Sequence, residues 1–134
     1  MKVTLMTSEG PILSQFRHEN ETWKRILEFL SDENIYLKNR LSEILRNIVD
    51  HDHVQLNKIE QFHNRLLNAD DRIKLLRKEV AENEMSLNRY ICLDGSLQKD
   101  FQKKQNKLMK DLKSAEGEFN KLKYEFNSYL DEIL

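Results

Sequence analysis

The chain has 134 residues, of which 39% are hydrophobic and 34% are charged, and it contains only 3 glycines and 1 proline. This composition predicts one domain of long, solvent-wrapped helices, and the single Cys92 excludes an intramolecular disulfide. A net charge of −1 argues against a general binder of polyanions, and the lack of any apolar run near ~20 residues favours a cytoplasmic protein without a membrane segment.

The N-terminal residues 1–11 are predicted to form a flexible segment, because nothing periodic precedes the pair Gly10-Pro11. The apolar run Val3–Met6 is too short for the core of a signal peptide. We expect residues 12–134 to form a single helical-bundle domain, with helices at about 14–49, 54–93 and 97–133.

Apolar residues recur at intervals of three and four along all three predicted helices, which is typical of coiled-coil packing. The sequence therefore predicts an assembly seam along these helices. Its principal members are Trp23, Leu30, Leu37, Leu41, Ile59, Phe62, Ile73, Phe119 and Phe126.

The first corner decides the architecture. The apolar pattern lapses from Asp50 to Gln55, and Asp52 followed by Gln55 resembles a capping box. We therefore favour a turn at residues 50–53 and an antiparallel three-helix bundle with coiled-coil-like packing. The alternative is one long helix plus a return helix, which would leave the first part of the seam uncovered and would require a dimer.

The second corner is predicted at Asp94-Gly95-Ser96, with glycine ending one helix and Ser96 capping the next. A reversal there places residues whose numbers sum to about 188 opposite each other. In this register each small residue faces a large one, and Asn83 faces Gln105. A reversal at the first corner places Asn20 opposite Asn83. We predict that this polar layer, and Asn34 on the seam, fix the helix register.

Three of the four histidines lie in the stretch IVDHDHVQLNKIEQFH, residues 48–63, which raises the question of a metal site. Glu60-x-x-His63 has the spacing of a di-iron ligand pair, but that chemistry needs a second pair on a facing helix. The predicted register places Glu43 and Arg40 there instead. We therefore predict polar residues around a turn, with no metal and no cofactor.

A stripe of lysines is predicted on the outer side of the third helix, opposite its apolar residues. Its members are Lys99, Lys103, Lys107, Lys110, Lys113 and Lys121. Such a stripe could bind nucleic acid or an anionic surface. No aromatic side chain is interleaved for base stacking and no arginine is present to clamp phosphate, so the pattern favours a solvated helix face.

The sequence contains no glycine-rich phosphate loop, no nucleophile elbow and no pair of inward carboxylates. We therefore expect a protein that is not an enzyme. The expected function is a non-catalytic coiled-coil or helical-bundle interaction or scaffold protein, which forms a homodimer or docks a partner helix. The alternative is binding of nucleic acid or an anionic surface through the lysine stripe.

Overall fold

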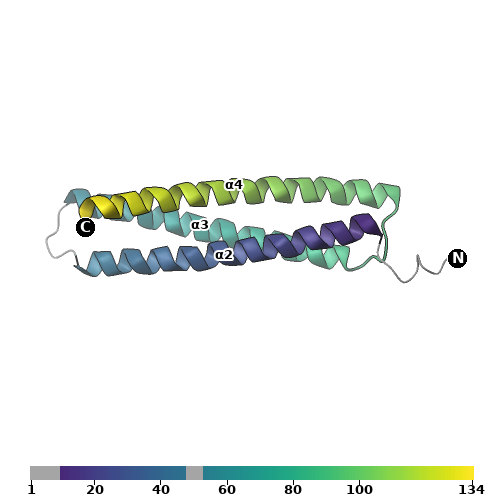
Figure 1. Cartoon of the computed structure of the whole chain (residues 1–134), viewed down its shortest axis with the longest axis horizontal. Coiled ribbons are helices and arrows are strands. Elements are labelled where there is room, and N and C mark those ends of the chain that lie inside the picture. The colour runs from purple at the N-terminus through teal and green to yellow at the C-terminus, as the bar shows by residue number, and fades with distance from the viewer. Residues whose placement is uncertain (1–9, 48–52) are drawn as a thin grey trace. The chain divides into compact units, whose positions relative to one another are not determined.

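The computed structural model describes residues 10–47 and 53–134. They contain three α-helices and no strand: α2 at Pro11–Asn47, α3 at His53–Leu87 and α4 at Gly95–Ile133. The helices pack against one another (Figure 1), which confirms the predicted all-α three-helix bundle. Within the described residues, no helix has the length and apolar content needed to cross a membrane.

The chain forms two compact units. The first unit combines the described residues up to Leu27 with Leu75–Lys113, and the second combines Glu28–Lys74 with Ser114–Leu134. Each unit therefore contains one segment of every helix. The prediction of a single domain over residues 12–134 concerns how the units behave together and stays a prediction.

Helix α2 begins at Pro11, three residues before the predicted start. The carbonyl of Gly10 accepts the first helical hydrogen bond, from the Ser14 N–H at 3.1 Å. Proline is favoured at this first position because its φ angle is already helical and it has no N–H to leave unpaired. Of the segment 1–11 that was predicted to be flexible, residues 1–9 lie outside the described residues and Pro11 belongs to α2.

The N-terminal part of α2 contributes two core residues that the predicted seam did not include. Leu13 and Phe16 are fully buried and pack in one cluster with Leu87 and Phe101 of the first unit. This cluster contains the pair Leu87 and Phe101, which the predicted register of the second and third helices places opposite each other.

The first corner separates α2 from α3, as predicted, and the alternative of one long helix is therefore wrong. Helix α2 ends at Asn47 and α3 begins at His53. Asp50, His51 and Asp52, on which the turn and the capping box were predicted, lie outside the described residues.

Helix α3 ends at Leu87, whereas the sequence predicted a helix to residue 93. Two short turns follow, in which the N–H groups of Arg89 and Tyr90 bond the carbonyls of Ser86 and Leu87. Ile91, which the sum of 188 pairs with Leu97, is 66% exposed and so lies outside the buried core.

The side chain of Arg17 explains where α3 stops. Its guanidinium donates to the carbonyl oxygens of Leu87 at 3.2 Å and Tyr90 at 2.9 Å. The last carbonyls of a helix have no partner inside the helix, and a cation there also interacts favourably with the helix dipole. Arg17 therefore satisfies the end of α3 from another helix.

Helix α4 is capped by Asp94, whereas the sequence predicted Ser96 as the cap. The Asp94 carboxylate accepts a hydrogen bond from the Leu97 N–H at 2.8 Å, and its carbonyl accepts from the Gln98 N–H at 2.8 Å. Gly95 is the first residue of α4, and no described glycine has a positive φ, so the prediction that Gly95 ends the preceding helix is wrong.

We expect Asp94→Ala to lower the free energy of unfolding by about 1 kcal/mol, because a helix N–H loses its acceptor. Chemical denaturation measures this change. Ser96→Ala is the matched control, with an expected change within about 0.5 kcal/mol. A larger loss in Ser96→Ala than in Asp94→Ala would contradict the assignment of the cap.

Candidate functional site

The predicted assembly seam is buried inside the chain's own bundle. Each member is at most 7% exposed: Trp23, Leu30, Leu37, Leu41, Ile59, Phe62, Ile73, Phe119 and Phe126. In the second unit, the rings of Phe62 and Phe126 meet edge to face at a centroid distance of 5.3 Å, as the register predicts. Because these side chains are already covered, a partner that binds the closed bundle must contact other residues. A role of the seam in assembly between chains stays a prediction.

The predicted polar layer is present in the first unit. Asn20, Asn83 and Gln105 are 1%, 0% and 2% exposed. The Asn83 amide nitrogen donates to the side-chain oxygens of Asn20, at 3.1 Å, and of Gln105. Each of the three helices therefore contributes one residue to a single layer. These contacts confirm the predicted registers of α2 with α3 and of α3 with α4.

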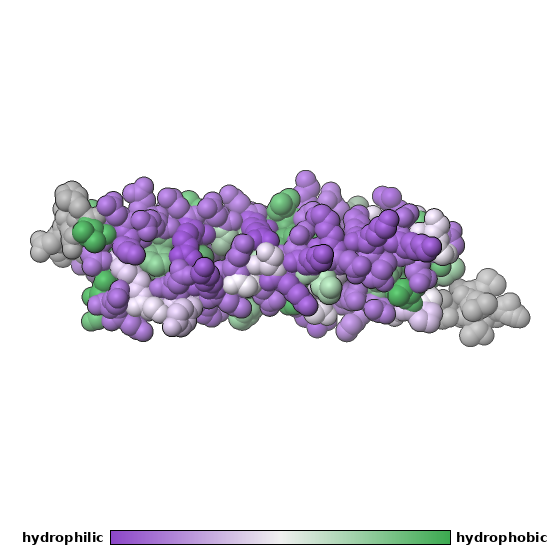
Figure 2. Space-filling model, turned by 90° about the horizontal axis from the view of Figure 1, so that it is seen from above, coloured by the Kyte–Doolittle hydropathy of each residue, from purple (hydrophilic) through white to green (hydrophobic). Residues whose placement is uncertain are grey.

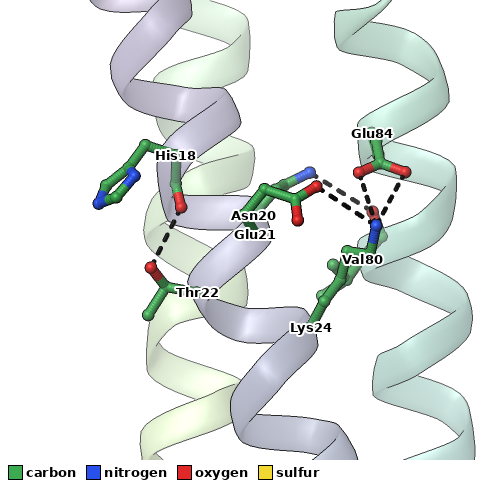
Figure 3. A network of polar contacts seen from close by, with 7 residues as sticks. All are labelled: His18, Asn20, Glu21, Thr22, Lys24, Val80 and Glu84. Carbon is green, nitrogen blue, oxygen red and sulfur yellow. Dashed lines mark hydrogen bonds and ion pairs between the residues drawn. The ribbon is translucent and has the colours of Figure 1, made fainter.

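The side-chain amide nitrogens of Asn20 and Gln105 are also hydrogen-bonded. The Asn20 amide donates to the Val80 carbonyl at 3.4 Å, as Figure 3 shows, and the Gln105 amide donates to the Glu19 carboxylate at 2.8 Å. The Asn83 side-chain oxygen has no hydrogen-bond partner among the described residues. Since buried amides that lack partners cost free energy, the layer favours the one register in which most of them pair.

An ion-pair network lies beside the polar layer in the first unit (Figure 3). The Lys24 ammonium lies 3.0 Å from the Glu84 carboxylate of α3 and 3.3 Å from Glu21. Hydrogen bonds to Glu84 and Glu21 raise the pKa of Lys24, and the hydrogen bond from Lys24 lowers the pKa of Glu21. Lys24 and Glu21 are solvent-exposed, Glu84 is half-buried, and both carboxylates pair with the ammonium, so the network favours a structural role over catalysis.

The second unit contains a buried asparagine at the predicted seam position. Asn34 is fully buried, and its amide nitrogen donates to the Leu66 carbonyl of α3 at 3.1 Å. Its side-chain oxygen has no partner among the described residues. Asn34 thus contacts the neighbouring helix as a residue that fixes the register would.

Ion pairs link the helices of the second unit. The carboxylate of Asp70 lies 3.4 Å from the Lys38 ammonium of α2 and 3.3 Å from Lys74. Burial acts to raise the pKa of Asp70, but the hydrogen bond from Lys74 and the charge of Lys38 outweigh it and leave this pKa below its usual value. Across α3 and α4, the hydrogen bond from Arg65 lowers the pKa of Glu125.

The lowered pKa of Asp70 predicts a pH-dependent contribution to stability. The folded state binds the proton more weakly than the unfolded chain, whose Asp pKa is about 3.9. The contribution is therefore present above that pH and is lost as the pH falls through the lower, folded pKa. We expect Asp70→Asn to cost up to about 1 kcal/mol at pH 7 and clearly less near pH 2.

Denaturation of wild type and Asp70→Asn across this pH range measures the effect. Asp71→Asn is the control, since Asp71 is exposed and forms no ion pair with a described residue. Equal losses for Asp70→Asn at both pH values would contradict the role of its charge.

The predicted lysine stripe lies on the solvent-exposed surface of α4. All six lysines are exposed: Lys99, Lys103, Lys107, Lys110, Lys113 and Lys121. Lys107 pairs with Asp111 at 2.8 Å, and this hydrogen bond raises the pKa of Lys107. The other five form no ion pair within the part of the chain that the structure describes. Figure 2, which views the side on which α4 lies in Figure 1, shows a mostly hydrophilic surface.

Several large apolar side chains are exposed on the outer surface, and the sequence prediction did not single them out. Phe29 and Tyr36 of α2 are 61% and 62% exposed, and Tyr124 of α4 is 74% exposed. Phe29 and Tyr36 lie seven residues apart, so they share one side of the helix. That spacing, shifted from the buried pattern, is the signal that could have identified them.

A surface pocket of about 350 Å³ in the second unit contains neither a histidine nor a cysteine. It is lined by Arg65, Asn68, Ala69, Arg72, Ile73, Ala115, Glu118, Phe119, Lys121 and Leu122. Arg72 pairs with Glu118 of the pocket, and Arg65 pairs with Glu125 outside it, so both arginines have carboxylate partners. This pocket offers no nucleophile with an adjacent base.

The described residues contain no group of three or more metal-binding side chains. His63 and Glu60 are exposed, while Asp50 and His51 of the histidine-rich stretch lie outside the described residues. The prediction that this stretch binds no metal therefore stays a prediction.

These features define the chain as an all-α protein with three packed helices, internal polar contacts that fix their register, and a charged outer surface. Comparison with known protein families, with curated proteins and with solved structures finds no match.

Proposed function

We propose that the chain is a non-catalytic, cytoplasmic interaction or scaffold protein, which self-associates or docks a helix of a partner. The observation that carries this proposal is the exposed apolar surface of α2, where Phe29 and Tyr36 stand out from an otherwise charged helix face. Aromatic side chains supply much of the binding energy at protein interfaces. The single cysteine, exposed and free, supports a reducing compartment.

The proposal is tested by comparing wild type with a Phe29→Ser/Tyr36→Ser variant. We expect wild type either to exceed the 16.1 kDa mass of one chain in sedimentation, or to co-purify with a second protein in a fixed ratio. The variant should lose that association while it keeps its helical content. A wild type that stays monomeric and retains no protein partner would contradict the proposal.

The alternative proposal is binding of nucleic acid or an anionic surface through the lysine stripe. The observation in its favour is that five of the six lysines are exposed and form no ion pair with a described residue. Counterion release would make such binding fall steeply with salt. Binding to RNA, DNA or anionic vesicles that is lost in Lys103→Glu/Lys110→Glu and at high salt would support it.

A further inference from the structure

The two compact units carry opposite net charges. Among the described residues, the first unit has 12 Lys and Arg against 8 Asp and Glu, which gives +4. The second unit has 9 Lys and Arg against 12 Asp and Glu, which gives −3. The overall charge of −1 conceals this separation. The first unit of one molecule therefore attracts the second unit of another.

In the first unit, a row of lysines without ion-pair partners lies on the outer face of α4. Lys99, Lys103, Lys110 and Lys113 are exposed and make no ion pair within the described residues, whereas Lys107 is held by Asp111. The four recur at intervals of four, seven and three residues, so they line one side of the helix. They leave a row of ammonium groups that a carboxylate partner could neutralise.

In the second unit, α2 presents an outer face of matching character, which we name the α2 outer face. It consists of Glu28, Phe29, Asp32, Ile35 and Tyr36, all of them exposed. Glu28 and Asp32 are four residues apart, and no described residue forms an ion pair with either. Two uncompensated carboxylates thus flank exposed aromatic rings on one helix face.

We infer that the α2 outer face of one molecule docks onto the lysine stripe of a second copy of this chain. Carboxylates four residues apart match lysines four residues apart, and the aromatic pair and the pair Lys103 and Lys110 are both seven residues apart. Lysine stems cover the exposed rings while their ammonium groups reach the carboxylates and the ring faces. This inference rests on the proposed interaction function and names its partner.

A second copy fits the stripe better than nucleic acid does. Nucleic acid would be repelled by the net negative second unit, and the stripe has no arginine or aromatic group with which to hold phosphate or bases. A second copy instead supplies both carboxylates and apolar surface, and its own excess charges are neutralised by the contact.

The test uses two charge-reversed variants of the full chain, Glu28→Lys/Asp32→Lys and Lys103→Glu/Lys110→Glu. We expect wild type to self-associate in sedimentation equilibrium at low salt, and each variant alone to bind itself about tenfold or more weakly, because like charges then meet. An equimolar mixture of the two should recover association, since each variant offers the charge that the other lacks. Raising the salt should weaken all of these contacts.

Matched controls reverse exposed charges elsewhere in the same units. Glu60→Lys/Asp71→Lys changes two exposed acids of α3 in the second unit, and Arg77→Glu/Lys78→Glu changes two exposed bases of α3 in the first. Both keep the residues of the proposed contact, so they should weaken association far less than the two variants that reverse charges within the contact. Circular dichroism of every variant checks that the helices remain.

A wild type that stays monomeric at low salt, or self-association that neither variant weakens, would overturn the inference. A loss of self-association in both variants that the equimolar mixture fails to restore would also overturn it. The proposed function would survive each of these results if wild type associated with a second copy or with another protein and Phe29→Ser/Tyr36→Ser abolished that association. Salt-dependent binding of monomeric wild type to RNA or vesicles would overturn the inference in favour of the alternative.

Discussion

Phe126→Ala should lower the free energy of unfolding by about 3–5 kcal/mol, the usual cost of truncating a fully buried phenylalanine. Phe126 has no exposed surface and packs edge to face against Phe62, whose ring also lies 5.3 Å from that of Tyr129. Removing the ring leaves a cavity inside the second unit. Since domains are stable by only about 5–15 kcal/mol, much of the fold's stability should disappear.

Tyr124→Ala provides the control for Phe126→Ala. Tyr124 lies two residues earlier on the same helix and is 74% exposed, so its truncation should change stability by no more than about 0.5 kcal/mol. Urea denaturation followed by circular dichroism measures both variants. A loss below about 1 kcal/mol in Phe126→Ala would contradict the packing register of α3 and α4.

The helix register was predictable because polar and apolar layers constrain it together. Periodicity alone allows several registers, but placing Asn83 opposite Gln105 also places Phe62 opposite Phe126, and the structure contains both contacts. A shift along the helix would bury an unpaired amide against an apolar side chain, which costs free energy.

The ends of the helices were less predictable, because they depend on distant partners. Ile91 continues the apolar pattern of α3, yet the helix ends at Leu87, where Arg17 bonds the terminal carbonyls. Nothing local to residues 87–93 indicates that contact. By contrast, Leu13 and Phe16 continue the spacing of three and four back from Trp23, and their place in the core could have been predicted.

The functional surface could be predicted only in part. A heptad seam is equally compatible with packing within a chain and packing between chains, and the structure places its residues inside one chain. The lysine stripe was predictable because it lies opposite the buried face of a single helix. The α2 outer face combines charge and exposed aromatic surface, and the spacing of Phe29 and Tyr36, shifted from the buried pattern of α2, could have identified it.

Replacing only Asn83 should be the most damaging change to the polar layer. In Asn83→Leu, the side-chain oxygens of Asn20 and Gln105 lose the amide that donates to both, and an unpaired buried acceptor costs about 1–3 kcal/mol. We therefore expect a loss of several kcal/mol, measured by chemical denaturation. Lys78→Ala is the control, since Lys78 is exposed on the same helix.

Replacing the whole layer should give the opposite result for stability. In Asn20→Leu/Asn83→Leu/Gln105→Leu no buried amide of the layer is left without a hydrogen-bond partner. The free energy of unfolding should therefore return to the wild-type value or exceed it. What is lost is the discrimination between registers, because an apolar layer pairs with any other apolar layer. Broadened or doubled amide resonances in an NMR spectrum of the triple variant would report that loss. A triple variant as destabilised as Asn83→Leu would show that packing, and not amide pairing, determines the stability of this layer.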